Sequence, residues 1–82
     1  MMEFSEGDFV AVRFIGHVPE YSDFIRSCFI NNLISCASVE VDNPHTQKYT
    51  ITIQLTDYGV DRVEKLINDF SGNILFRAKA VR

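Results

Sequence analysis

The sequence has two histidines, His17 and His45, and two cysteines, Cys28 and Cys36, which are residue types that perform acid–base, metal or thiol chemistry. The histidines fall in two different connections, which we expect at opposite ends of a sheet, so they would not share a metal or act together. The cysteines lie eight positions apart, without the further cysteines or histidines of a zinc spacing. We expect two reduced, partly buried thiols, with Cys28 on a helix and Cys36 on or just before a strand, and no metal or cofactor.

Short motifs that mark common enzyme classes are missing from the sequence. It contains no H-x-x-E-H, no G-x-S-x-G, no phosphate loop and no dinucleotide fingerprint. Each of the four glycines falls at the boundary of an expected element, where a turn explains it. No serine or acidic residue pairs with a recognisable base. We therefore expect a protein that is not an enzyme.

Composition and charge restrict the class of protein further. The 82 residues are 46% hydrophobic, which indicates a folded chain and excludes disorder. A net charge of -3 does not fit a strongly basic nucleic-acid-binding protein, and it is too mild for a mimic of DNA. No apolar run reaches the ~20 residues of a membrane span, and residues 1–5 are acidic where a signal peptide is basic. We expect one cytoplasmic domain over residues 8–82, preceded by a flexible segment over residues 1–7.

The periodicity of apolar residues predicts six elements in the order β-α-β-β-α-β. Strands are expected over 8–15, 35–41, 48–55 and 73–81, and helices over 19–33 and from Thr56 or Asp57 to Phe70. A polar loop around Pro44 joins the middle strands into a hairpin. This order is typical of the ferredoxin-like α+β plait, a four-stranded antiparallel sheet with both helices on one face. The first and third strands would be central, and Ala37, Val39 and Val41 would point inward with the core.

One face of such a sheet has no helix over it and is the candidate binding surface. The first and last strands would each point both apolar and basic side chains toward this face. The candidate binding residues are Phe9, Arg13, Leu75, Arg77 and Lys79. Neighbouring strands would bring Arg13 and Arg77 side by side, with Phe9 and Leu75 as apolar contacts. An apolar patch with a charged rim is typical of protein interfaces.

Nucleic acid is the less favoured partner for that face. RNA-recognition domains of this plan stack bases on aromatic residues of the two central strands. Here the third strand would present Thr50, Thr52 and Gln54, and Phe9 is the one outward aromatic on the first strand. We therefore expect a protein partner, a second copy of the chain, or both, and no nucleic acid or membrane.

The element order, together with Gly16-His17-Val18-Pro19 at the start of the first helix, resembles the ACT family of regulatory domains. The stretches 49–55 and 56–63 are also similar to the third strand and second helix of trimeric nitrogen-regulatory signalling proteins. The ACT resemblance implies a ferredoxin-like fold and a small-molecule effector near residues 17–19. Pro19 is followed by Glu20, whereas ACT domains usually have a Pro-Gly pair there.

These observations favour a non-enzymatic module that covers the surface of another protein, and that forms a dimer. Small acidic domains of this plan include phage-encoded inhibitors of bacterial defence, of the anti-CRISPR kind. An ACT-like sensor of small molecules is the alternative. A third hypothesis is an enzyme of the acylphosphatase type, but that family needs an arginine in the first loop and an asparagine on the second strand. Here Arg13 falls inside a strand and no asparagine precedes Asn43 on the second.

Overall fold

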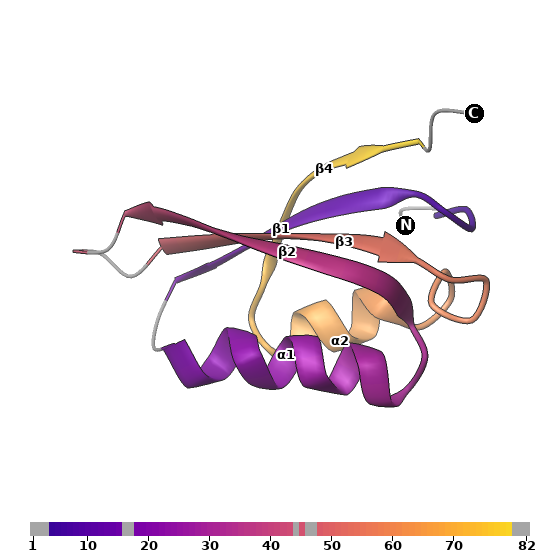
Figure 1. Cartoon of the computed structure of the whole chain (residues 1–82), viewed down its shortest axis with the longest axis horizontal. Coiled ribbons are helices and arrows are strands. Elements are labelled where there is room, and N and C mark those ends of the chain that lie inside the picture. The colour runs from indigo at the N-terminus through magenta and orange to yellow at the C-terminus, as the bar shows by residue number, and fades with distance from the viewer. Residues whose placement is uncertain (1–3, 16–17, 44, 46–47, 80–82) are drawn as a thin grey trace.

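The computed structural model describes residues 4–15, 18–43, 45 and 48–79, and its six elements follow the predicted order (Figure 1). The elements are β1 Phe9–Ile15, α1 Val18–Ile30, β2 Ile34–Asn43, β3 Lys48–Leu55, α2 Val63–Asp69 and β4 Asn73–Ala78. The four strands form one antiparallel sheet in the order β2-β3-β1-β4. Both helices lie on the same side of it (Figure 1). The predicted α+β ferredoxin-like plait is confirmed, with β1 and β3 at its centre.

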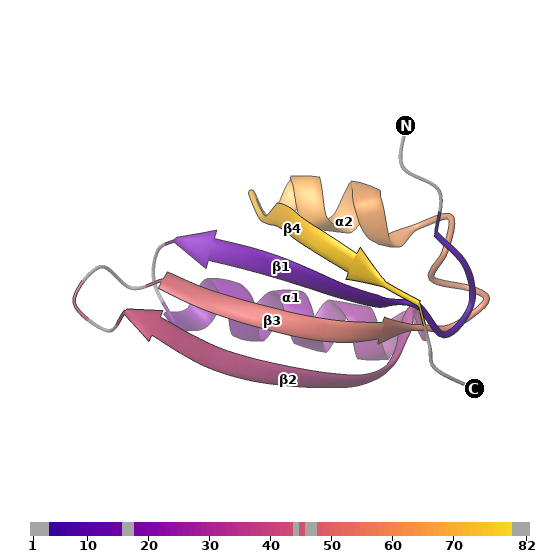
Figure 2. The ribbon, with the colours of Figure 1, turned by 90° about the horizontal axis from the view of Figure 1, so that it is seen from above.

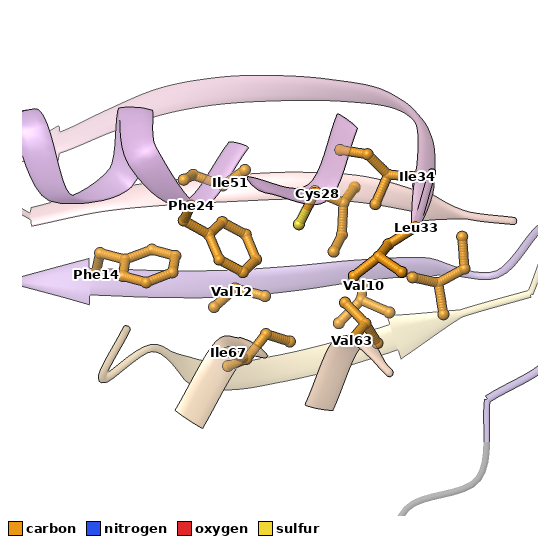
Figure 3. Packing of buried hydrophobic residues seen from close by; sticks show 12 residues of the cluster. Val10, Val12, Phe14, Phe24, Cys28, Leu33, Ile34, Ile51, Val63 and Ile67 are labelled. Carbon is orange, nitrogen blue, oxygen red and sulfur yellow. The ribbon is translucent and has the colours of Figure 1, made fainter. Parts of the chain in front are cut away.

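The hydrophobic core lies between the inner face of the sheet and the two helices (Figure 3). Val10 and Val12 on β1 stand opposite Ile53 and Ile51 on β3, and all four are fully buried. From α1, the ring of Phe24 lies 4.9 Å from that of Phe14, measured between ring centroids. Alternate residues of the central strands and one stripe of each helix therefore meet in a single cluster, as their periodicity predicts.

The two helices end in the same way, and an outer strand follows each of them. Asn32 after α1 and Ser71 after α2 have φ angles of 58° and 59°, in the left-handed region that glycine usually occupies. In both turns a following N–H reaches back along the helix, from Leu33 to the Cys28 carbonyl and from Gly72 to the Ile67 carbonyl, each at 2.8 Å. These bonds satisfy carbonyl groups that the helix end leaves open, and they turn the chain into β2 and β4.

The second helix begins later than the sequence predicts. We expected it to start at Thr56 or Asp57, but α2 begins at Val63 and turns occupy the intervening residues. Thr56 stabilises the first of these turns, because its hydroxyl accepts a hydrogen bond from the Gly59 N–H at 3.1 Å and donates to the Asn32 carbonyl at 2.6 Å. A Cβ atom on Gly59 would lie 2.0 Å from the Leu33 carbonyl oxygen. Only glycine fits here, because the turn packs directly against the backbone that leads into β2.

The strand β2 is longer and more exposed than predicted. Val39 and Val41 stand opposite Ile51 and Tyr49, so they share the inner side of the sheet as expected. However, they are 43% and 52% exposed. Figure 2 shows the cause: α1 runs behind β3, while β2 forms the outer edge beyond the helix.

The connections that carry the two histidines lie at one end of the sheet. Ile15, the last residue of β1, pairs with Lys48, the first residue of β3. The β1–α1 connection and the β2–β3 hairpin therefore start from the same end, and our expectation of opposite ends is wrong. His45 is exposed, and its N–H donates to the Asn43 side-chain oxygen at 2.9 Å. His17 lies outside the described residues.

The chain before β1 is described from Phe4 onward. Phe4 packs against the core, and the Gly7 N–H donates to the Leu55 carbonyl at 2.8 Å. Asp8, just before the strand, is buried, and its carboxylate accepts a hydrogen bond from the Ser5 N–H at 2.9 Å. Residues 4–7 thus contact the end of the sheet where β3 stops.

Candidate interaction surface

The open face is the side of the sheet that neither helix covers (Figure 1). Directly opposed residues of antiparallel strands point to the same face, so the register of each pair identifies its members. The open face consists of Phe9, Ala11, Arg13 and Ile15 on β1, Lys48, Thr50, Thr52 and Gln54 on β3, Cys36, Ser38, Glu40 and Asn43 on β2, and Asn73, Phe76 and Ala78 on β4. The predicted candidates Phe9 and Arg13 belong to it, but Arg77 does not.

A β-bulge in the pairing of β1 with β4 moves Arg77 away from the open face. Ala11 pairs with Phe76 but Val12 pairs with Ile74, so Leu75 is an extra residue on β4. An extra residue reverses the side to which the following residues point. Arg77 therefore stands opposite Val10, whose side chain is in the core. The prediction that Arg13 and Arg77 lie side by side is wrong for this reason.

Arg77 instead forms an ion pair on the helix side of the sheet. Its Nε lies 3.9 Å from the Asp8 Oδ2, and its guanidinium lies 6.0 Å from the centre of the Phe4 ring. The side chain of Asp8 is 3% exposed, whereas that of Arg77 is 32% exposed. Arg77 therefore supplies the positive charge next to a buried carboxylate, a stabilising role that sequence reasoning missed.

The other two candidates on the C-terminal strand lie near the open face but are not part of its regular register. Leu75 is the bulged residue and is 40% exposed. Lys79 follows the last residue of β4 and is exposed. We predicted that β4 presents basic side chains on the open face. Because of the bulge, β4 presents the apolar side chains of Phe76 and Ala78 there instead.

Phe76 is an open-face aromatic residue that is not among the candidates predicted from the sequence. Its side chain is 59% exposed. It pairs with Ala11, which lies between Phe76 and Thr52 and is only 1% exposed, so neighbouring side chains close over this alanine. Phe9, one step away on the same face, is partly exposed. Phe9 and Phe76 are diagonal neighbours, and large side chains at such positions are within reach of each other.

Arg13 belongs to a polar network on the other half of the open face. Its Nε lies 3.4 Å from the Asp42 Oδ2, and the Thr50 hydroxyl donates to the same oxygen. The side chains of Arg13 and Asp42 are 39% and 26% exposed. The carboxylate of Asp42 thus compensates the charge of Arg13, so the open face presents an apolar region beside a balanced polar one.

The two cysteines have contrasting surroundings and are both free. Cys28 lies on α1, as predicted, and is fully buried; this burial raises the pKa of its thiol to about 12. The thiol therefore stays protonated at neutral pH and is a poor nucleophile. Cys36 lies on β2 and is exposed rather than partly buried, and its Sγ lies 3.5 Å from the Gln54 Oε1.

Other sites that could hold a ligand are shallow. A groove of about 480 Å³ lies at the end of β3, lined by Glu6, Gly7, Ser35, Gln54, Leu55, Thr56 and Asp57. Within the described ranges, no three histidine, cysteine or acidic side chains are close enough together to hold a metal ion. Neither described helix has the length and apolarity needed to cross a membrane.

The open face thus carries an exposed phenylalanine beside a second aromatic ring, together with a compensated arginine. Comparison with protein-family models and with curated proteins finds no match to this chain.

Proposed function

We propose that this chain is a protein-interaction module that covers a surface of another protein with its open face. The observation that carries the proposal is the 59% exposure of Phe76 on a sheet face that neither helix covers. An aromatic side chain of this size gains considerable free energy when a partner removes it from water. Aromatic residues and arginine also supply most of the binding energy at protein interfaces.

The arrangement around Phe76 supports the same interpretation. Phe9 and Phe76 form an apolar region on the β4 side of the open face, and the ion pair of Arg13 with Asp42 lies next to it. Protein interfaces commonly combine buried apolar contacts with polar contacts around them. That a partner would be a bacterial defence protein remains a prediction from the small size and acidic charge of the chain.

Binding of a small effector, as in ACT domains, also remains a prediction. Of residues 17–19, near which the effector would bind, residue 17 lies outside the described part of the chain.

Quantitative affinity capture with three baits tests the proposal. The baits are wild type, Phe76→Glu on the open face, and Lys65→Glu as the control. Lys65 is 85% exposed on α2, where it pairs with Asp69 within the helix. A partner that uses the open face is retained by wild type and by Lys65→Glu, and lost by Phe76→Glu. Circular dichroism confirms that each bait is folded.

Calorimetry with the purified partner then gives the size of the effect. We expect Phe76→Glu to weaken binding by more than about 1.4 kcal/mol, a tenfold change, and Lys65→Glu to change it by less than about twofold. A partner that binds Phe76→Glu normally and fails to bind Lys65→Glu would show that the helical surface is the binding surface, and the proposal would be wrong.

A further inference from the structure

The β2 edge, residues 36–41, is the outer border of the sheet on the side away from β4. Its inner neighbour is β3, and no other described strand pairs with it. Backbone N–H and C=O groups on its outer side are therefore available for pairing with another strand.

Nothing in the sequence of β2 prevents such pairing. The strand is ten residues long and contains no proline and no lysine, the residues that commonly protect an exposed edge. Its irregularities are confined to the two ends, between Ile34 and Cys36 and between Val41 and Asn43. The β2 edge between them is regular, and a regular edge accepts a further strand without distortion.

One side of the β2 edge is also apolar and uncovered. Val39 and Val41 are 43% and 52% exposed on the helix side of the sheet. Phe29 on α1, on that same side, is 46% exposed. The charged residue of the β2 edge, Glu40, lies on the opposite side of the sheet, on the open face. A strand that pairs here would therefore gain from apolar residues on its helix side.

The β2 edge of a second copy meets these requirements, and we propose that two copies pair there in antiparallel orientation about a two-fold axis at Val39. In that register Val39 stands opposite Val39 of the second copy, and Val41 stands opposite Ala37. Glu40 stands opposite Ser38, so neither acid of the strand directly opposes an acid. A shift that centred the axis on Glu40 would instead oppose two carboxylates, which is unfavourable.

This pairing would join two four-stranded sheets into one of eight strands. A two-fold axis perpendicular to the sheet leaves both open faces on the same side. The inference is independent of the proposed function, because it uses the β2 edge and not the surface around Phe9 and Phe76. Where both hold, a dimer would present two open faces to its partner.

Charge pairs across the axis provide the first test. Sedimentation velocity is measured for wild type, Val39→Lys, Val39→Glu, and an equal mixture of these two variants. In the proposed register residue 39 stands opposite residue 39 of the second copy. Each variant alone therefore places two like charges together, and we expect at least tenfold weaker self-association. The mixture places lysine opposite glutamate and should associate again. The matched control, Ile15→Lys, changes a 59% exposed residue on β1 and should associate as wild type does.

Cysteine cross-linking provides a second test that tolerates some loss of stability. Opposed residues of antiparallel strands have Cα atoms about 4.5–5.5 Å apart, within the range that a disulfide can bridge. In a Cys36→Ser background, Val39→Cys should form a covalent dimer rapidly under mild oxidation. Val41→Cys in the same background faces Ala37 and should cross-link much more slowly.

Any of the following outcomes would overturn the proposal. The first is a wild-type protein that remains monomeric at about 100 μM, where a dimer with micromolar affinity would be largely formed. The second is self-association that both Val39 charge variants leave unchanged. The third is a mixture of the two variants that does not associate, or cross-linking that is faster at residue 41 than at residue 39. Phe76→Glu should dimerise normally, so failure of the proposed function would leave this result intact.

Discussion

The two outer strands of the sheet differ in how they expose their edges. The strand β4 has six residues, a bulge at Leu75 within its pairing to β1, and two basic residues, Arg77 and Lys79, at or beyond its end. The strand β2 has ten residues, its irregularities lie at its ends, and it exposes Val39 and Val41. Short length, bulges and positive charge all discourage the addition of a strand. The molecule is therefore protected at the β4 edge and open to pairing at the β2 edge.

This difference also separates the two surfaces that we propose to be functional. The bulge that protects β4 is the same feature that turns Phe76 outward and Arg77 inward. The apolar region of the open face, formed by Phe9 and Phe76, thus lies beside the edge that does not accept strands. A partner can contact Phe76 while a second copy pairs with β2, because the two central strands lie between these regions.

The largest predicted effect compares the centre of the sheet with the β2 edge. Ile53 on β3 and Val39 on β2 are both on the helix side, but Ile53 is fully buried and Val39 is 43% exposed. Ile53→Asp would bury a carboxylate without a partner, at a cost of more than about 4 kcal/mol. Because small domains are stable by only about 5–15 kcal/mol, we expect this variant to be largely unfolded.

The matched change at the edge should be tolerated. Val39→Asp keeps its carboxylate in contact with water, so we expect a loss of about 1 kcal/mol, within the usual range for partly exposed positions. Urea unfolding followed by circular dichroism measures both variants, at a protein concentration well below the dissociation constant of the proposed dimer so that self-association does not contribute. Equal losses for the two variants would mean that the inner side of β2 is covered as fully as that of β3.

The next prediction concerns the β4 edge. Arg77→Glu places a second carboxylate near Asp8, whose side chain is 3% exposed, so we expect the protein to lose about 2–3 kcal/mol of stability. Arg13→Glu, next to the more exposed Asp42, should cost less than about 1 kcal/mol. Adding Asp8→Asn to Arg77→Glu removes the repulsion and keeps the acceptor for the Ser5 N–H, so part of the stability should return. Denaturant unfolding of the three variants and wild type measures this order, and a larger loss for Arg13→Glu than for Arg77→Glu would contradict it.

The sequence predicted the fold because its apolar residues repeat with clear periods. The alternating apolar residues of β3, among them Ile51 and Ile53, lie in the core, and so does Phe24 at helical spacing on α1. Each pattern spans several residues and depends only on local geometry, so no knowledge of distant neighbours was needed.

The open face was predicted less well, because its composition depends on register. A single extra residue on β4 places Phe76 on the open face and Arg77 on the helix side. No glycine or proline within the strand indicates the bulge in the sequence. Bulges arise from how one strand fits its neighbour, which alternation along a single strand does not reveal. Likewise, the exposure of Val39 depends on where α1 crosses the sheet, and the spacing of residues within β2 carries no information about that (Figure 2).

The smallest predicted effect concerns the turns that lead into the two outer strands. Asn32 before β2 and Ser71 before β4 both have left-handed backbone conformations. Asparagine tolerates this conformation better than serine, and glycine adopts it without steric cost. We expect Ser71→Gly to raise stability by about 0.5–1 kcal/mol, and Asn32→Gly to raise it by less than about 0.3 kcal/mol.

Thermal melting measures this difference. For a domain of this size, about 1 kcal/mol corresponds to a Tm shift of roughly 4–8 °C, so the gain from Ser71→Gly is detectable. The control is Gly72→Ala at the next position, where a Cβ atom would lie 2.7 Å from Val12 Cγ1 and 2.8 Å from Phe14 Cζ in the core. That variant should melt at a lower temperature than wild type. If Asn32→Gly gained more than Ser71→Gly, the β2 turn would be the more strained of the two, and strain would then not follow from residue type alone.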